Sequence, residues 1–189
     1  MSLRVTFDLS DKDLRHFRRI MRESRAGAKE MADEEVISAA ETLLTSVREQ
    51  SVSDFVNQRL EKLAVMIDML RDEEWQIPKK EHARVISALS YFAEEEDLIP
   101  DHIPVLGFLD DAIMIELVVR ELRHEIEAYE DFCAFRKEET KRPKSEQDDE
   151  ARLARLAKRR TALHERMRRR GRRQRRTRRG SGGPRLSLF

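Results

Sequence analysis

Apolar residues recur every three or four positions along most of this chain, and this spacing constrains its fold more than any other feature. The longest stripe comprises Ile115, Val119, Leu122, Ile126, Tyr129 and Cys133. Shorter stripes of the same spacing lie at 14–21, 36–47 and 56–70. Glycine occurs only twice in the first 150 residues, at Gly27 and Gly107. The pattern therefore predicts an all-α protein.

The helical stripes predict a compact bundle of about five helices, followed by a charged sixth helix and a disordered basic tail. Ser10 with Asp13, and Ser51 with Asp54, have the spacing of N-terminal caps for the first and third helices. The stripe from Ile115 to Cys133 predicts one long, uninterrupted fifth helix. A helix with a single apolar seam of that length needs a partner helix to cover it.

The first residues alternate between apolar and polar side chains from Leu3 to Leu9, which is the period of a strand. No second strand is predicted anywhere else in the chain. We therefore expect a short N-terminal extended arm that lies on the helices. The alternative is that it pairs with its own copy, which makes a homo-oligomer a candidate assembly.

Charge divides the chain into two unlike parts. Residues 1–150 contain 22 basic and 36 acidic residues, a net charge of −14, whereas residues 151–189 contain 16 and 1, a net charge of +15. We predict an acidic helical domain at 1–142, a charged amphipathic helix at 143–170 and a disordered Arg/Gly-rich tail at 171–189. Such asymmetry favours either a polyanion-binding tail or a tail that folds back onto the acidic part.

The composition favours a soluble cytoplasmic protein. Cys133 is the only cysteine, so no intramolecular disulfide can form, and the first residues contain no apolar run typical of a secretory signal. The most apolar stretch, Leu98 to Val119, is interrupted by several charged residues, which argues against a membrane span.

One stretch, EDLIPDHIPVLGFLDD at 96–111, interrupts the helical pattern. Its prolines disfavour helical geometry at the preceding residues, and Gly107 permits a turn. Its four aspartates are Asp97, Asp101, Asp110 and Asp111. We interpret the stretch as a structural corner in which the last two aspartates cap the next helix. The alternative is a site for a hard divalent cation, which prefers oxygen ligands.

The sequence DLIPDHIPVLGFLDD resembles the signature of the YkvA-like family, whose motif reads approximately D-L-I-P-D-x-I-P-x-x-G-x-x-D-D. This is a family of small bacterial helical proteins with a domain of unknown function. The resemblance implies a helical fold and no established activity. Many relatives are more apolar around the motif and are membrane-associated, so a peripheral membrane protein is one alternative.

Basic residues dominate the segment RMRRRGRRQRRTRRG at 166–180, which resembles arginine-rich RNA-binding peptides. Its ten arginines are Arg166, Arg168, Arg169, Arg170, Arg172, Arg173, Arg175, Arg176, Arg178 and Arg179. Guanidinium groups pair with phosphates and release counterions, so RNA, DNA or a ribosome is the predicted partner. The segment contains no aromatic residue on which single-stranded bases could stack. The alternative is a solubilising tail that shields the acidic part.

The last residues, RLSLF, resemble the short peptide with which bacterial replication and repair proteins dock on the DNA sliding clamp, approximately Q-L-S/D-L-F. Leu186, Leu188 and Phe189 would fill an apolar groove of that partner. Arg185 stands at the position where the motif has glutamine.

No nucleophile triad, phosphate-binding glycine loop or H-E-x-x-H motif is present. We therefore favour a non-enzymatic binding or adaptor protein that needs no cofactor. The alternative is a metal-dependent enzyme that uses the aspartates of 97–111. Among other residues, Trp75 is expected to plug a helix end, and His124 and His164 to be solvated among charges.

Overall fold

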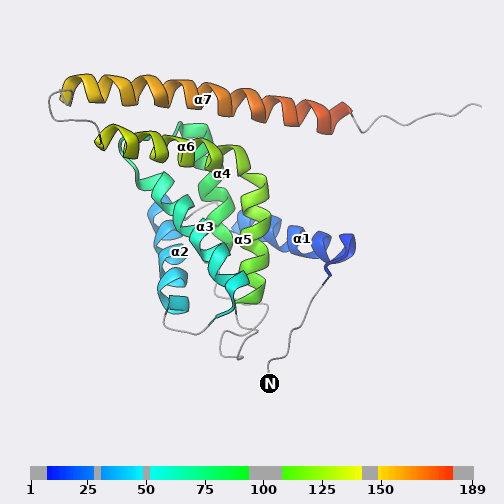
Figure 1. Cartoon of the computed structure of the whole chain (residues 1–189). Helices are drawn as coiled ribbons and strands as arrows, with labels where there is room; N and C mark the ends of the chain where they lie inside the picture. The colour runs from blue at the N-terminus through cyan, green and yellow to red at the C-terminus, as the bar shows by residue number, and fades with distance from the viewer. Residues whose placement is uncertain (1–7, 28–30, 49–51, 94–107, 142–148, 181–189) are drawn as a thin grey trace, which may run out of the picture. The chain divides into compact units, whose positions relative to one another are not determined.

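The computed structural model of the chain describes residues 8–27, 31–48, 52–93, 108–141 and 149–180, with the backbone alone at 174–180 (Figure 1). Every regular element in these ranges is a helix, which confirms the predicted all-α fold. The elements are α1 (Asp11–Gly27), α2 (Asp33–Arg48), α3 (Asp54–Arg71), α4 (Lys79–Leu89), the 3-10 helix η2 (Ser90–Ala93), α5 (Leu109–Glu121), α6 (Arg123–Thr140) and α7 (Asp149–Gly180). The predicted extended arm lies outside the described residues, apart from Asp8 and Leu9.

The chain forms two compact units. The first takes in Met1–Leu70 and Lys79–Glu121, and so contains the five helices α1 to α5 apart from the last residue of α3. The second takes in Arg71–Pro78 and Leu122–Phe189, and so contains α6, α7 and the segment that follows α3. The three domains predicted from composition, with boundaries at residues 142 and 170, stay a prediction.

The core of the first unit is made by the apolar stripes that the sequence predicted. Residues of these stripes that the structure buries are Met21, Val36, Ala40, Val47, Val56, Leu60, Leu63, Ile67 and Ile115, and Val85 and Leu89 of α4 are buried as well. Burial of each large aliphatic side chain contributes about 1.5–3 kcal/mol, so a helical stripe is stable only where others cover it. The predicted spacing therefore identifies the faces that pack inward.

Two helix starts were predicted from caps; the structure confirms the one at Ser10, whereas Ser51 lies outside the described residues. The Ser10 amide donates to the Asp13 carboxylate at 2.9 Å, and the Asp13 amide donates to Ser10 Oγ at 3.4 Å, as in a capping box. The Ser10 hydroxyl also donates to the Asp13 carboxylate at 2.6 Å, and this bond, followed by that of the Ser10 amide, lowers the pKa of Asp13. At α3 the cap is Ser53, whose Oγ accepts the Val56 amide at 3.3 Å, because the helix begins at Asp54.

The predicted long fifth helix is wrong, because the structure divides it into α5 and α6 at Leu122. Leu122 has φ −97° and ψ 13°, and its carbonyl accepts the amides of Glu125 and Ile126 at 2.9 and 3.0 Å. Its side chain is fully buried. The three- and four-residue spacing of apolar residues is therefore the same on both sides of Leu122. No glycine or proline near Leu122 indicates the helix break in the sequence.

α7 continues across Gly171, where we expected the charged helix to end, and reaches Gly180. Glycine in a helix interior costs about 1 kcal/mol relative to alanine, whereas arginine is a good helix former. All eight residues from Arg168 to Arg176 other than Gly171 are arginine or glutamine, which favour continuation of the helix. A single glycine among them does not end the helix.

We predict that Ser53→Ala lowers the free energy of unfolding by about 0.5–2 kcal/mol, because it removes the acceptor for the Val56 amide at the start of α3. Ser53→Gly is the matched control and should cost only a few tenths of a kcal/mol, since glycine is itself accepted at this position. Urea unfolding followed by circular dichroism measures both. Equal losses would contradict the assigned cap.

Candidate nucleic-acid interface

The second unit is organised by a short turn that follows α3. One oxygen of Asp72 accepts the backbone amides of Glu74 and Trp75, both at 2.9 Å, and the Asp72 carbonyl accepts the Gln76 amide at 3.1 Å. An aspartate that bonds to the backbone two and three residues ahead stabilises a turn locally. The turn thereby sets the direction in which Trp75 leaves the backbone.

Trp75 lies at the centre of this unit instead of merely plugging a helix end. Its side chain is fully buried, and its ring packs against Tyr129 and Phe132 of α6 at centroid distances of 5.7 and 5.2 Å. The His164 ring of α7 lies edge-on to it at 4.4 Å. Large aromatic side chains dominate the stability of small cores, so α6 and α7 both depend on this one ring.

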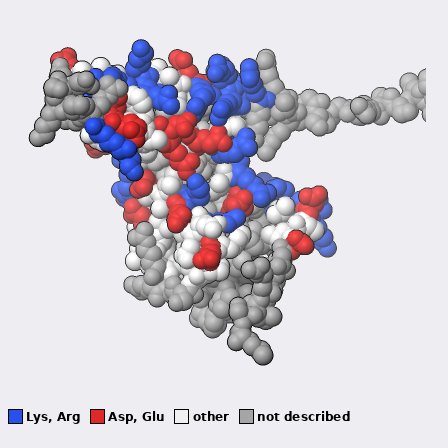
Figure 2. Space-filling view, viewed as in Figure 1, with Lys and Arg blue, Asp and Glu red and all other residues white. Residues whose placement is uncertain are grey.

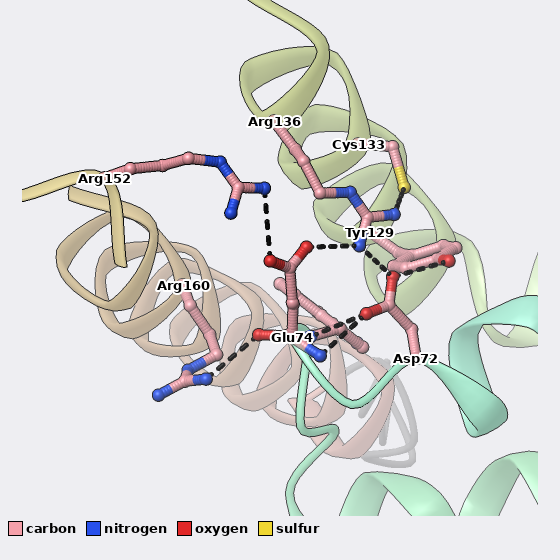
Figure 3. A network of polar contacts seen from close by, with 8 residues as sticks. Asp72, Glu74, Tyr129, Cys133, Arg136, Arg152 and Arg160 are labelled. Carbon is pink, nitrogen blue, oxygen red and sulfur yellow. Dashed lines mark hydrogen bonds and ion pairs between the residues drawn. The ribbon is translucent and has the colours of Figure 1, made fainter. Parts of the chain in front are cut away.

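The Asp72 carboxylate also bonds to α6 (Figure 3). It accepts the Tyr129 hydroxyl at 3.0 Å and lies 2.7 Å from Nη1 of Arg136. Burial raises the pKa of Tyr129 far above its ordinary value, so this hydroxyl stays a donor. Burial disfavours the charge of Arg136, but the hydrogen bond to Glu74 and the charge of Asp72 outweigh it and raise that pKa.

Glu74 connects the same turn to both helices. Its carboxylate accepts Arg136 of α6 at 3.1 Å and Arg152 of α7 at 3.2 Å, while its carbonyl accepts Arg160 of α7 at 2.9 Å (Figure 3). Three guanidinium groups thus converge on one acidic residue. The carboxylate shared by Arg136 and Arg152 offsets the repulsion between these two groups, which makes Glu74 the electrostatic connection of α7 to the turn.

Further ion pairs run along the seam between α6 and α7, which pack against each other. Arg155 pairs with the buried Glu139 at 2.5 Å, Arg166 pairs with Asp131, and Arg170 pairs with Glu127 at 2.9 Å. Residue numbers ascend in one helix as they descend in the other, so the two helices are antiparallel. Apolar side chains of α7 that are buried in this unit are Leu156, Leu163 and Met167.

The prediction that His164 is solvated is wrong. Burial, together with the charges of Arg168 and Arg160, lowers its pKa from 6.5 to about 4. The imidazole is therefore neutral at physiological pH and packs as a ring against Trp75. His124 is not freely solvated either, because only 12% of its side chain is exposed. Both histidines have charged neighbours in the sequence, so the sequence alone did not indicate that they lie on covered faces of their helices.

The arginines predicted to bind nucleic acid divide into two classes. Arg166 and Arg170 are paired with carboxylates of α6, as described above. Arg168, Arg169 and Arg172 are exposed, and none of them forms an ion pair with a residue that the structure describes. In Figure 2, basic side chains gather over α7 and acidic ones over α6.

The remaining predicted arginines are less fully placed. Arg173 is exposed on α7. The last four lie on the helical backbone of α7, and their side chains are outside the description; they are Arg175, Arg176, Arg178 and Arg179.

The aspartates of the 96–111 stretch are only partly described. Asp110 and Asp111 lie buried in the first turn of α5, while Asp97 and Asp101 lie outside the described residues, so the structural corner stays a prediction. Within the described part of the chain, no three His, Cys, Asp or Glu side chains are placed to hold a metal ion. The metal alternative stays a prediction, as does the terminal peptide Leu186, Leu188 and Phe189, which also lies outside the description.

Sequence reasoning missed the acidic partners of α7. Glu74 ends a run of three acids, Asp72–Glu74, and Glu127, Asp131 and Glu139 are spaced by four and eight along one face of α6. That spacing was the available signal, since acids at helical intervals form a face that an arginine-rich helix complements. The docked arginines lie between Arg152 and Arg170, and the alternative of a tail that folds back onto the acidic part stays a prediction.

Comparison with known proteins identifies one similarity. Residues 83–117 match the family described as "Protein of unknown function (DUF1232)". The matched stretch runs from α4 into α5 and contains the motif with the four aspartates. No curated protein and no solved structure matches the chain. Among the described helices, none has the length and apolar character that crossing a membrane requires.

We predict that Glu74→Gln destabilises the second unit by about 1–2 kcal/mol, because it removes the negative charge that Arg136 and Arg152 share. Glu73→Gln is the matched control, since this neighbouring side chain is exposed, and should be nearly neutral. Trp75 is the only tryptophan, so its fluorescence during urea unfolding reports this unit alone. A loss of the same size in both variants would contradict the role of Glu74.

The second unit should also lose stability in weak acid. The pKa of His164 is lowered from 6.5 to about 4 by burial, so folding favours the neutral ring. Its contribution is complete above pH 6.5 and decreases as the pH falls from 6.5 toward 4. Trp75 fluorescence in urea at pH 7.0, 6.0 and 5.0 measures this. His164→Phe keeps a ring in place and should flatten the dependence; an unchanged slope would show that other groups cause it.

Proposed function

We propose that this protein is a non-enzymatic binding or adaptor protein that contacts the phosphate backbone of nucleic acid through α7. The observation that carries the proposal is the exposed group Arg168, Arg169 and Arg172, which has no ion-pair partner among the described residues. Guanidinium groups hold phosphates with two parallel hydrogen bonds, and each contact releases condensed counterions.

The docked face of α7 supports this proposal. A helix with so many arginines would repel itself and fray in isolation. Here the carboxylates of Glu127, Asp131 and Glu139 neutralise one face, and the turn at Glu74 holds its N-terminal half. The exposed guanidinium groups are therefore presented on an ordered backbone, which lowers the entropy lost on binding.

The chemistry implies affinity without base specificity. Contacts to phosphate position a protein on nucleic acid and carry no direct sequence information. No cofactor is needed for such binding. On the sequence resemblance alone, Leu186, Leu188 and Phe189 stay a candidate peptide for a sliding clamp, which would bring the protein to DNA.

We expect the triple variant Arg168→Gln, Arg169→Gln, Arg172→Gln to lower affinity for labelled nucleic acid by at least about tenfold at 0.1 M salt. The slope of log K against log salt should fall by about 2 to 3, since three phosphate contacts are lost. Fluorescence anisotropy with the full chain, over several salt concentrations, measures both quantities.

The matched control removes three charges elsewhere. Arg15, Arg18 and Arg22 are exposed on α1, so their replacement by Gln changes the net charge by the same amount. This variant should keep the wild-type slope. The proposal is overturned if the α7 variant binds like wild type, or if both variants lose affinity equally, because net charge would then be the cause.

A further inference from the structure

We infer that the nucleic acid taken by α7 is double-stranded DNA of B form, held with phosphates of both strands on the two flanks of the helix. This inference rests on the proposed phosphate binding and adds the class of partner. It depends on how the exposed arginines are distributed around α7, on the aromatic residues of the second unit and on the size of the grooves.

The exposed arginines face in more than one direction. Successive residues of an α-helix are rotated by about 100°, so Arg168 and Arg169 lie on opposite flanks of the face turned away from Leu163 and Met167. Arg172 lies between these two flanks and about 6 Å beyond Arg168 along the axis. The phosphates of a single strand would contact one flank of α7 only. The phosphates of two strands, one on either side of a groove, would contact both flanks.

The dimensions of B-form DNA suit this arrangement. An α-helix with its side chains is about 10–12 Å across, and the major groove of B-DNA is about 12 Å wide. α7 packs on α6 by its opposite face, so the arginine face is the one that can enter. The major groove of A-form RNA is deep and narrow, and does not admit a helix in this way.

Single-stranded nucleic acid fits the unit less well. Proteins that bind single strands without sequence preference stack bases on exposed aromatic rings. α7 contains no Phe, Tyr or Trp. Of the described aromatic residues in this unit, Trp75, Tyr129 and Phe132 are buried, and the guanidinium of Arg159 lies 5.6 Å from the Phe135 ring. Of these rings, only the half-buried Phe135 of α6 is partly accessible, and none lies on α7.

Gly171 offers a test that changes no charge. It lies within α7 among the exposed arginines, and a Cβ built on it meets no atom within 4 Å. Gly171→Ala therefore orders the helix without a clash, because alanine is the strongest helix former. Gly171→Pro removes an amide donor and clashes with the preceding turn, which separates Arg172 from the docked part of α7.

Binding of the full chain to a DNA duplex, the same sequence as single strands, and the matching RNA duplex should be measured at 0.15 M salt. We expect the DNA duplex to bind at least about tenfold more tightly than either single strand or the RNA duplex. Gly171→Ala should strengthen duplex DNA binding up to about fivefold, and Gly171→Pro should weaken it about tenfold, with little change for single strands.

Each outcome decides between the two proposals. Equal or tighter binding of single strands overturns the duplex inference and leaves phosphate binding intact. Equal binding of duplex RNA overturns the assignment to B form. If both Gly171 variants change duplex and single-strand affinity by the same factor, the ordered two-flank contact is overturned. If no nucleic acid binds, the proposed function itself fails.

Discussion

The second unit depends on one carboxylate, that of Asp72. It accepts two backbone amides of its own turn, the hydroxyl of Tyr129 and the guanidinium of Arg136, so it joins local backbone geometry to packing against α6. The turn places Trp75 in the core and Glu74 beside α7. Without that turn, neither the aromatic contacts of Trp75 nor the bonds of the three arginines to Glu74 would form. A buried polar network is stable only when its members are satisfied together.

Docking resolves the electrostatic problem that the arginine-rich helix poses. Like charges at helical spacing repel one another, and the acids of α6 remove part of that repulsion along one face. Arg166 and Arg170 serve this role, because they pair with Asp131 and Glu127 across the seam between α6 and α7. Arg168, Arg169 and Arg172 carry no such commitment among the described residues. The arginines that stabilise the packing of α7 on α6 are therefore different residues from the exposed arginines that remain available for a partner.

The family match and the proposed binding surface belong to different units. Residues 83–117 lie in the first unit with α4 and α5, whereas α6 and α7 form the second. Buried Asp110 and Asp111 fit a role in shaping the entry to α5, where Phe108 adopts φ 63°. An unusual backbone at a buried position shows that the surrounding packing determines it. Similarity to this stretch alone therefore does not imply the exposed arginines of α7.

Local signals in the sequence determined the helical class, the faces that pack inward, the Ser10 cap and the ten-arginine segment, because periodicity, capping and net charge depend on near neighbours along the chain. Only the tertiary structure decided that the stripe breaks at Leu122, since a buried leucine keeps the same spacing on either side. It alone decided that His164 is neutral and which arginines are paired, because burial and ion pairing depend on residues distant in sequence, such as Glu74 and Asp131.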